Sequence, residues 1–217
     1  EDIMQTAVIF DLDGTLVNSL PDIAACMNRA LAKAGLPTFA TDDYKYKVGD
    51  GVLKIAERSV GDRTDKFDQV LADYMADYAV HCRVNSYAYE GVAEAIKTMI
   101  SRGLRACVLS NKDQADTESV LAHYFPDVAF SVVRGRVEDV PLKPAPDAAL
   151  LIAEQLAVRP EECWYVGDTS MDMRCGNAAG METIGVLWGF RPREELVANH
   201  ARHLAAAPGE LTAITAA

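Results

Sequence analysis

The chain has 217 residues, 50% of them hydrophobic, which is enough to bury a sizeable core. Its formal net charge of −11 argues against a general nucleic-acid-binding surface, which needs clustered Lys and Arg. An anionic substrate must therefore be attracted by local positive charge or by a metal ion.

The first predicted element is a buried strand at residues 8–10, followed by Asp11, Asp13 and a turn at Gly14. Side chains two positions apart in a strand point the same way, so both carboxylates leave the strand end on one side. Carboxylates held this close repel each other unless a cation or a proton lies between them. The pattern indicates a functional site at the carboxyl end of this strand.

Residues 17–83 are predicted to be mostly helical. Ser19, with Asp22 three residues later, is typical of a helix start, and this helix is expected to end at Gly35. Because the helical run follows directly after the first strand, we interpret it as a separate layer inserted into the chain. Its other expected helices begin at residue 41 and cover residues 52–60 and 67–78.

From Gly91 onward, predicted helices alternate with apolar strands. This alternation implies parallel strands joined by right-handed crossovers, and therefore an open α/β sheet that binds ligands beyond the carboxyl ends of its strands. The predicted domains are a catalytic core of residues 1–16 and 84–217 and a helical cap of residues 17–83. A closing strand and helix are expected after Ala201. The other expected strands are 104–109, 128–133, 163–166 and 183–187, and the expected helices are 92–101, 113–124, 146–156 and 171–179.

Polar groups follow several of these strands. Ser110 and Asn111 come after the second core strand, Lys143 lies just ahead of a helix start, and Asp168 and Asp172 follow the strand at 163–166. Each segment alone has a plainer interpretation as a turn, a helix cap or a solvated lysine. Together, in this order and mostly at strand ends, they indicate a single site.

The ordered set, which begins with Asp-Leu-Asp-Gly-Thr-Leu-Val at residues 11–17, resembles the four motifs of the haloacid dehalogenase-like hydrolases. The resemblance covers the whole chain. It implies a Rossmann-like core, that is, an open parallel sheet with helices on both faces, plus an inserted all-helical cap. It also implies a Mg²⁺-dependent phosphatase that works through an aspartyl-phosphate intermediate.

The resemblance implies Asp11 as the nucleophile, which splits one difficult step into two. It implies Asp13 as the general acid that protonates the leaving oxygen and later deprotonates the attacking water. Asp11 and Asp168 would bind Mg²⁺ through their side chains and Asp13 through its carbonyl, because Mg²⁺ prefers oxygen ligands.

The remaining motif residues are assigned supporting roles by the same resemblance. Ser110, the Asn111 amide and Lys143 would hold the phosphoryl oxygens as negative charge spreads over them. Asp172 would position Lys143 or a metal-bound water. Thr15, counted with the substrate-binding residues, would steady Asp13 through a hydrogen bond.

Substrate specificity must come from the cap, which would close over the site as a lid. Residues 45–54 are the best candidates, because their glycines let a loop approach the site and Lys47 and Lys54 could meet a carboxylate. The alternative is that these lysines are ordinary surface charge. Gly49-Asp50-Gly51, followed by Glu57-Arg58, is similar to the cap of phosphoglycolate phosphatases, so a small phosphate monoester of this type is the leading substrate hypothesis.

Three other functions stay open. The cap type is shared with β-phosphoglucomutase-like phosphomutases. Lys54 resembles the Schiff-base lysine of phosphonoacetaldehyde hydrolases, although the presence of Asp13 suits ester hydrolysis. A non-enzymatic phospho-acceptor module would use Asp11 as a switch but has little need for a general acid at Asp13.

The five cysteines are odd in number and form no C-x-x-C pair, which argues against a disulfide framework or a zinc site. No apolar run reaches the length of a membrane span, and the acidic N-terminus lacks the pattern of a signal peptide. We therefore expect a cytoplasmic enzyme that acts on a small phosphorylated metabolite. Neither nucleic acid nor membrane is an expected partner, and both a monomer and a homodimer are compatible with the sequence.

Overall fold

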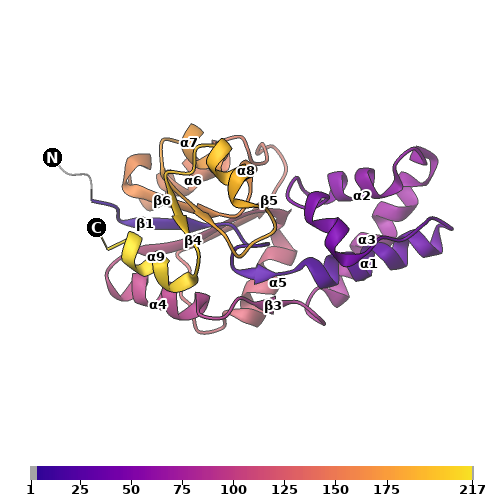
Figure 1. Cartoon of the computed structure of the whole chain (residues 1–217), viewed down its shortest axis with the longest axis horizontal. Coiled ribbons are helices and arrows are strands. Elements are labelled where there is room, and N and C mark those ends of the chain that lie inside the picture. The colour runs from indigo at the N-terminus through magenta and orange to yellow at the C-terminus, as the bar shows by residue number, and fades with distance from the viewer. Residues whose placement is uncertain (1–3, 217) are drawn as a thin grey trace.

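A six-stranded parallel sheet forms the centre of the larger lobe, as the computed structural model, which describes residues 4–216, shows (Figure 1). The strand order is β5-β4-β1-β6-β7-β8, and every neighbouring pair is parallel. The first strand, β1, lies between β4 and β6, so the motifs that follow these three strands share one edge of the sheet. The strands are β1 (Ala7–Phe10), β4 (Arg105–Asp113), β5 (Val132–Arg136), β6 (Cys163–Gly167), β7 (Glu182–Val186) and β8 (His203–Ala205).

Helices cover both faces of this sheet, and the sequence of β1 shows why. Successive side chains of a strand point to opposite faces. Val8 and Phe10 pack into one hydrophobic cluster, whereas Ala7 and Ile9 pack into a second one on the other face. A strand buried on both sides must be apolar throughout, and all four residues are fully buried. The covering helices are α4 (Val92–Ser101), α5 (Gln114–Tyr124), α6 (Asp147–Leu156), α7 (Ser170–Ala178), α8 (Arg193–Ala198) and α9 (Pro208–Ile214), with a 3₁₀ turn, η3 (Pro160–Glu162), ahead of β6.

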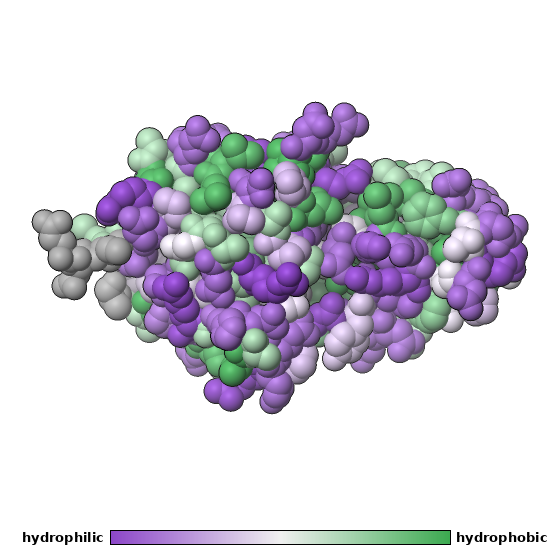
Figure 2. Space-filling view, turned by 90° about the horizontal axis from the view of Figure 1, so that it is seen from above, coloured by the Kyte–Doolittle hydropathy of each residue, from purple (hydrophilic) through white to green (hydrophobic). Residues whose placement is uncertain are grey.

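The inserted helices form a second lobe that faces the carboxyl ends of the strands (Figure 1). Its two long helices, α1 and α3, pack against each other. The face in Figure 2 is largely hydrophilic, and its hydrophobic side chains lie in small separate groups on both lobes. Within residues 4–216, no helix combines the length and apolar character needed to cross a bilayer. The lobe consists of α1 (Leu20–Lys33), η1 (Thr41–Tyr46), α2 (Val52–Val60), η2 (Thr64–Lys66) and α3 (Phe67–His81).

Two short strands connect the lobes side by side. β2 (Val17–Asn18) leads into the cap and pairs antiparallel with β3 (Tyr87–Ala88), which leads back out. The buried carboxylate of Asp22 ties the returning segment to α1. It accepts hydrogen bonds from the backbone N–H of residues 84, 85 and 86 at 2.8–3.0 Å and from the Ser86 hydroxyl at 2.6 Å.

The helix start predicted at residue 19 is confirmed, although neither side chain of the pattern caps the helix. The Ser19 side chain makes no capping hydrogen bond. The Asp22 carboxylate serves the returning connection, which lies more than 60 positions away in the sequence.

We expect Asp22→Ala to lower the free energy of unfolding by about 2–4 kcal/mol, because it leaves several buried backbone donors without their charged acceptor. Urea denaturation followed by circular dichroism measures the change. Asp68→Ala is a matched control, because Asp68 also lies in the first turn of a cap helix but is exposed. Equal effects of the two substitutions would show that the Asp22 contacts contribute nothing specific.

Some predicted elements differ from the structure. β4 continues to Asp113 and so includes the Ser110-Asn111 segment. β5 begins at Val132, since Val128 and Phe130 pack against the core from a loop rather than from a strand. The short helix α8 was not predicted, whereas a closing strand and helix do follow Ala201.

The division into core and cap at residues 16/17 and 83/84 stays a prediction. The expectation about a signal peptide concerns residues 1–3 as well, and these lie outside the described part.

Candidate active site

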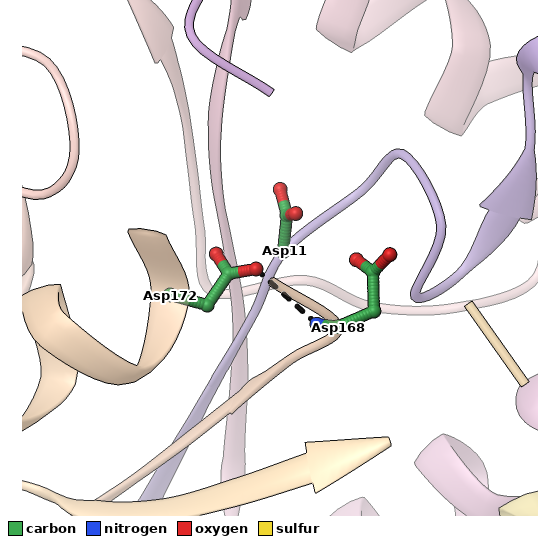
Figure 3. Close-up of side chains that lie close together, drawn as sticks. All are labelled: Asp11, Asp168 and Asp172. Carbon is green, nitrogen blue, oxygen red and sulfur yellow. Dashed lines mark hydrogen bonds between the residues drawn. The ribbon is translucent and has the colours of Figure 1, made fainter. Parts of the chain in front are cut away.

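Three carboxylates converge at the carboxyl ends of β1 and β6 (Figure 3). Asp11 follows β1 directly, Asp168 follows β6, and Asp172 comes from the first turn of α7. Each contributes an oxygen atom, and these oxygens all lie within 4.8 Å of one another. The two parent strands are paired in the sheet, so strand pairing places the side chains together.

Within residues 4–216, one ammonium group lies among these acids. Lys143, from the segment between β5 and α6, is 3% exposed. Its Nζ is 2.8 Å from Oδ1 of Asp11 and 2.7 Å from Oδ1 of Asp172. It also donates to the carbonyl of Leu109 at 3.3 Å. One positive charge thus faces three carboxylates.

The protonation equilibria reflect this excess of acid. Burial raises the pKa of Asp11, and the charge of Asp172 raises it further, although Lys143 opposes both. Burial also raises the pKa of Asp168 to about 7, against the hydrogen bonds that it accepts from Phe190 and Thr15. Burial alone would lower the pKa of Lys143, but Asp11 and Asp172 outweigh it and raise that pKa. A buried set of hard oxygen donors short of positive charge fits a divalent cation such as Mg²⁺.

Asp168 is held closely by its surroundings. Its Oδ1 accepts from the Thr15 hydroxyl at 3.0 Å and its Oδ2 from the Phe190 backbone at 2.8 Å. Gly14 has a positive φ of 83°, and a Cβ built there would lie 2.2 Å from Oδ2 of Asp168. Glycine at this turn therefore serves both the backbone conformation and the close approach of the carboxylate.

Asp172 is fully engaged on both oxygens. Oδ1 accepts from Lys143, whereas Oδ2 accepts from the backbone of Asp168 at 3.2 Å and from the backbone and hydroxyl of Thr169 at 3.1 and 2.9 Å. The contact on Oδ1 joins Asp172 to the ammonium that faces Asp11, and the positioning role of Asp172 stays a prediction. The ligand role predicted for the Asp13 carbonyl stays a prediction.

Asn111 joins three parts of the site. Its side-chain nitrogen donates to the carbonyls of Gly49 in the cap and of Lys143, at 2.9 and 3.1 Å. Its side-chain oxygen accepts from the backbone of Lys143 at 2.9 Å. Ser110 precedes it and lines the same cavity. The phosphate-binding roles of Ser110 and Asn111 stay predictions.

Asp13 lies beside a cation that sequence reasoning missed. Its Oδ2 is 3.1 Å from Nζ of Lys112, whose side chain is 7% exposed. Its Oδ1 is buried and has no hydrogen-bond partner within residues 4–216. Lys112 directly follows the Ser110-Asn111 motif on β4, and this adjacency to a predicted site segment could have identified it.

Three predicted contacts are wrong. The Thr15 hydroxyl donates to Asp168 rather than to Asp13. Lys47 donates to the carbonyl of Arg58 at 3.0 Å, and Lys54 is exposed and pairs with Glu57 at 2.6 Å. Neither cap lysine is among the residues that line the cavity. The reason for Lys54 is helical geometry, because the cavity-facing residues of α2 occupy the opposite side of that helix.

The cavity lies between core and cap and contains both aspartates of the first motif. Its floor is polar and comes from the core, including Asp11, Asp13 and Lys112. Its cap side is mostly apolar and carries two tyrosines that stack on each other with ring centroids 5.4 Å apart. The cap residues that line it are Ile23, Val48, Gly49, Gly51, Val52, Ile55, Tyr74, Met75 and Tyr78.

Comparisons with known proteins agree with this arrangement. The sequence profile of the family described as "Haloacid dehalogenase-like hydrolase" matches residues 8–186. Phosphoglycolate phosphatases from Cereibacter sphaeroides and Pseudomonas putida are 32% and 28% identical over 190 and 191 residues. These alignments cover 85% and 84% of this chain and 86% and 70% of the two relatives.

Solved structures share the fold. A predicted phosphoglycolate phosphatase from Haemophilus somnus 129pt aligns with a TM-score of 0.90 and 23% identity, covering 97% of this chain and 98% of that one. A predicted phosphatase from Clostridium acetobutylicum aligns with a TM-score of 0.87 and 20% identity, with the same two coverages. The predicted fold class, an open parallel sheet with an inserted helical cap, is confirmed.

Proposed function

The chain belongs to the haloacid dehalogenase-like hydrolases, and on this basis we propose that it is a Mg²⁺-dependent phosphatase of small phosphate monoesters, with phosphoglycolate as the leading substrate. The observation that carries the proposal is the buried cluster of Asp11, Asp168 and Asp172, opposed by the single charge of Lys143. Relatives that align with most of the chain are named phosphoglycolate phosphatases, and this supports the choice of substrate.

Asp11 is arranged to act as the nucleophile. Its Oδ1 accepts from the backbone of Leu12 at 2.7 Å and faces Lys143 at 2.8 Å. Oδ2 is therefore the oxygen that attacks phosphorus. The bond between Oδ2 and phosphorus forms as the bond from phosphorus to the leaving oxygen breaks, which yields an aspartyl-phosphate and an alkoxide that needs a proton.

Asp13 would supply that proton. Its buried Oδ1 lacks a partner within residues 4–216 and lines the same cavity as Asp11, so a leaving oxygen would satisfy it. In the second step Asp13 takes a proton from water, and the hydroxide formed attacks phosphorus. The bond to Asp11 then breaks and inorganic phosphate leaves, which restores the carboxylate of Asp11 and the protonated carboxyl of Asp13.

A bound Mg²⁺ would be held by Asp11 and Asp168, with the Asp13 carbonyl as the third protein ligand that the family resemblance implies. It would neutralise charge on the phosphoryl group and so allow a carboxylate to approach it. Asp172 would stay with Lys143, because its Oδ1 accepts from that ammonium and its Oδ2 already accepts three hydrogen bonds from Asp168 and Thr169.

The exposed position of Lys54 disfavours the alternative of a phosphonoacetaldehyde hydrolase. A Schiff-base lysine must reach the substrate and needs a lowered pKa from burial or neighbouring charge. Lys54 instead forms an exposed ion pair with Glu57 and does not line the cavity.

Phosphate release tests the proposal directly. The purified protein should release inorganic phosphate from 2-phosphoglycolate with Mg²⁺ present, should stop when EDTA is added, and should recover with excess Mg²⁺. Ethyl phosphate, p-nitrophenyl phosphate and β-glucose 1-phosphate complete the panel. Absence of metal-dependent release from every ester would contradict the proposal. Conversion of β-glucose 1-phosphate to glucose 6-phosphate without release would assign a mutase instead.

A further inference from the structure

Lys112 is a cation at the boundary between core and cap. It comes from β4 in the core, and its ammonium donates to the hydroxyl of Tyr78, on cap helix α3, at 2.6 Å. The same ammonium lies 4.5 Å from the centroid of the Tyr78 ring and 3.1 Å from Oδ2 of Asp13. Among the described residues that line the cavity, it is the only lysine or arginine.

The position of this ammonium relative to the leaving group follows from Asp13. In the proposed reaction the leaving oxygen contacts the unpartnered Oδ1 of Asp13, while Lys112 contacts Oδ2 of the same carboxylate. The leaving oxygen and the ammonium are thus bridged by one carboxyl group and lie on the order of 5 Å apart. A carboxylate attached one carbon away from the leaving oxygen spans this gap.

We propose that Lys112, held between Asp13 and Tyr78, binds a carboxylate on the leaving group and so selects 2-phosphocarboxylates among small phosphate monoesters. This inference rests on the proposed phosphatase function. It assigns to a core lysine the role that the sequence had suggested for Lys47 and Lys54, which the structure places away from the cavity.

Other acids near Lys112 compete little for its charge. Asp113 is already paired with Arg136 at 2.6 Å. Burial raises the pKa of Asp116, which favours its neutral form. The ammonium itself lies 3.1 Å from the carboxylate of Asp13, a contact that favours its charged form.

Because Tyr78 comes from the cap, it connects binding of the substrate carboxylate to closure of the cap. Tyr78 belongs to α3, and Asp13 and Lys112 belong to the core. A carboxylate bound at Lys112 would contact a cation that cap and core hold together, so an anionic leaving group favours the closed arrangement.

Lys112→Met tests the assignment through the ratio of the kcat/KM values for two substrates. Ethyl phosphate has a methyl group where 2-phosphoglycolate has its carboxylate. We expect Lys112→Met to lower kcat/KM for 2-phosphoglycolate about 10- to 100-fold more than for ethyl phosphate, mainly through KM. Lys112→Arg should recover part of this preference, because it keeps the positive charge. Tyr78→Phe should reduce the preference in the same direction by a smaller factor.

The ratio separates recognition from a role in holding Asp13. An effect through Asp13 alone would lower kcat/KM equally for both substrates. An unchanged ratio of the two kcat/KM values would overturn the assignment. Lys54→Met is the matched control, because Lys54 is an exposed cap lysine and should leave both rates unchanged. Failure of the phosphatase proposal is distinguishable, since the wild-type protein would then release phosphate from neither ester.

Discussion

Lys143→Met should lower the free energy of unfolding of the metal-free protein by about 3–5 kcal/mol, because removing one partner of a buried ion pair leaves the other charge uncompensated. Here the substitution leaves Asp11, Asp168 and Asp172 together without their cation. We also expect phosphate release to be lost, since the ammonium that contacts the nucleophile is gone.

Urea denaturation with EDTA present measures the stability change. Lys97→Met, at an exposed lysine on α4, is the control and should leave the midpoint nearly unchanged. The double substitution Lys143→Met/Asp11→Asn should recover part of the lost stability, because it removes one of the uncompensated charges. If the single substitution leaves the midpoint unchanged, the charge balance inferred for the cluster is wrong.

Asp11→Asn should lower phosphate release by at least about 10⁴-fold, because the amide cannot form the covalent intermediate and loss of a nucleophile removes most of the catalysis. The fold should persist. Lys143 keeps its contact with Asp172 when Asp11 is replaced, and the cluster loses one of three carboxylates that share a single cation, so the substitution should not lower the unfolding midpoint in EDTA.

Single-turnover phosphate release and thermal unfolding measure the two parts of this prediction. Asp62→Asn, at an exposed cap position, should retain full activity. Turnover by Asp11→Asn within tenfold of wild type would remove Asp11 from the role of nucleophile. A large drop in the midpoint would instead assign it a structural role through its contact with Lys143.

The sequence predicted the long elements well because each carries a strong local signal. The helix expected at 52–60 and the helix expected at 92–101 match α2 and α4. The junction strands β2 and β3 were missed, since two-residue strands show no period. The apolar side chains of Val128 and Phe130 predict a strand, but a loop can bury apolar side chains too.

The sequence allowed prediction of those parts of the site that the order of strands in the sheet determines. Parallel strands place their carboxyl ends at one edge, which brings Asp11 and Asp168 together whatever the intervening sequence does. Partners that depend on the direction of a single side chain were not predictable in this way. The hydroxyl of Thr15 could have met either aspartate, and the outward direction of Lys54 depends on how α2 packs.

The antiparallel pairing of β2 with β3 has a mechanical consequence. Both crossings between the lobes run side by side, and Asp22 ties the returning one to the first turn of α1. Such an attachment forms a single hinge between the lobes. Rotation of the cap about one axis is then sufficient to admit an ester and to release its products. Because the two ends of the insert are neighbours in space, a different insert could be grafted at this point while the chemical machinery beneath stays intact.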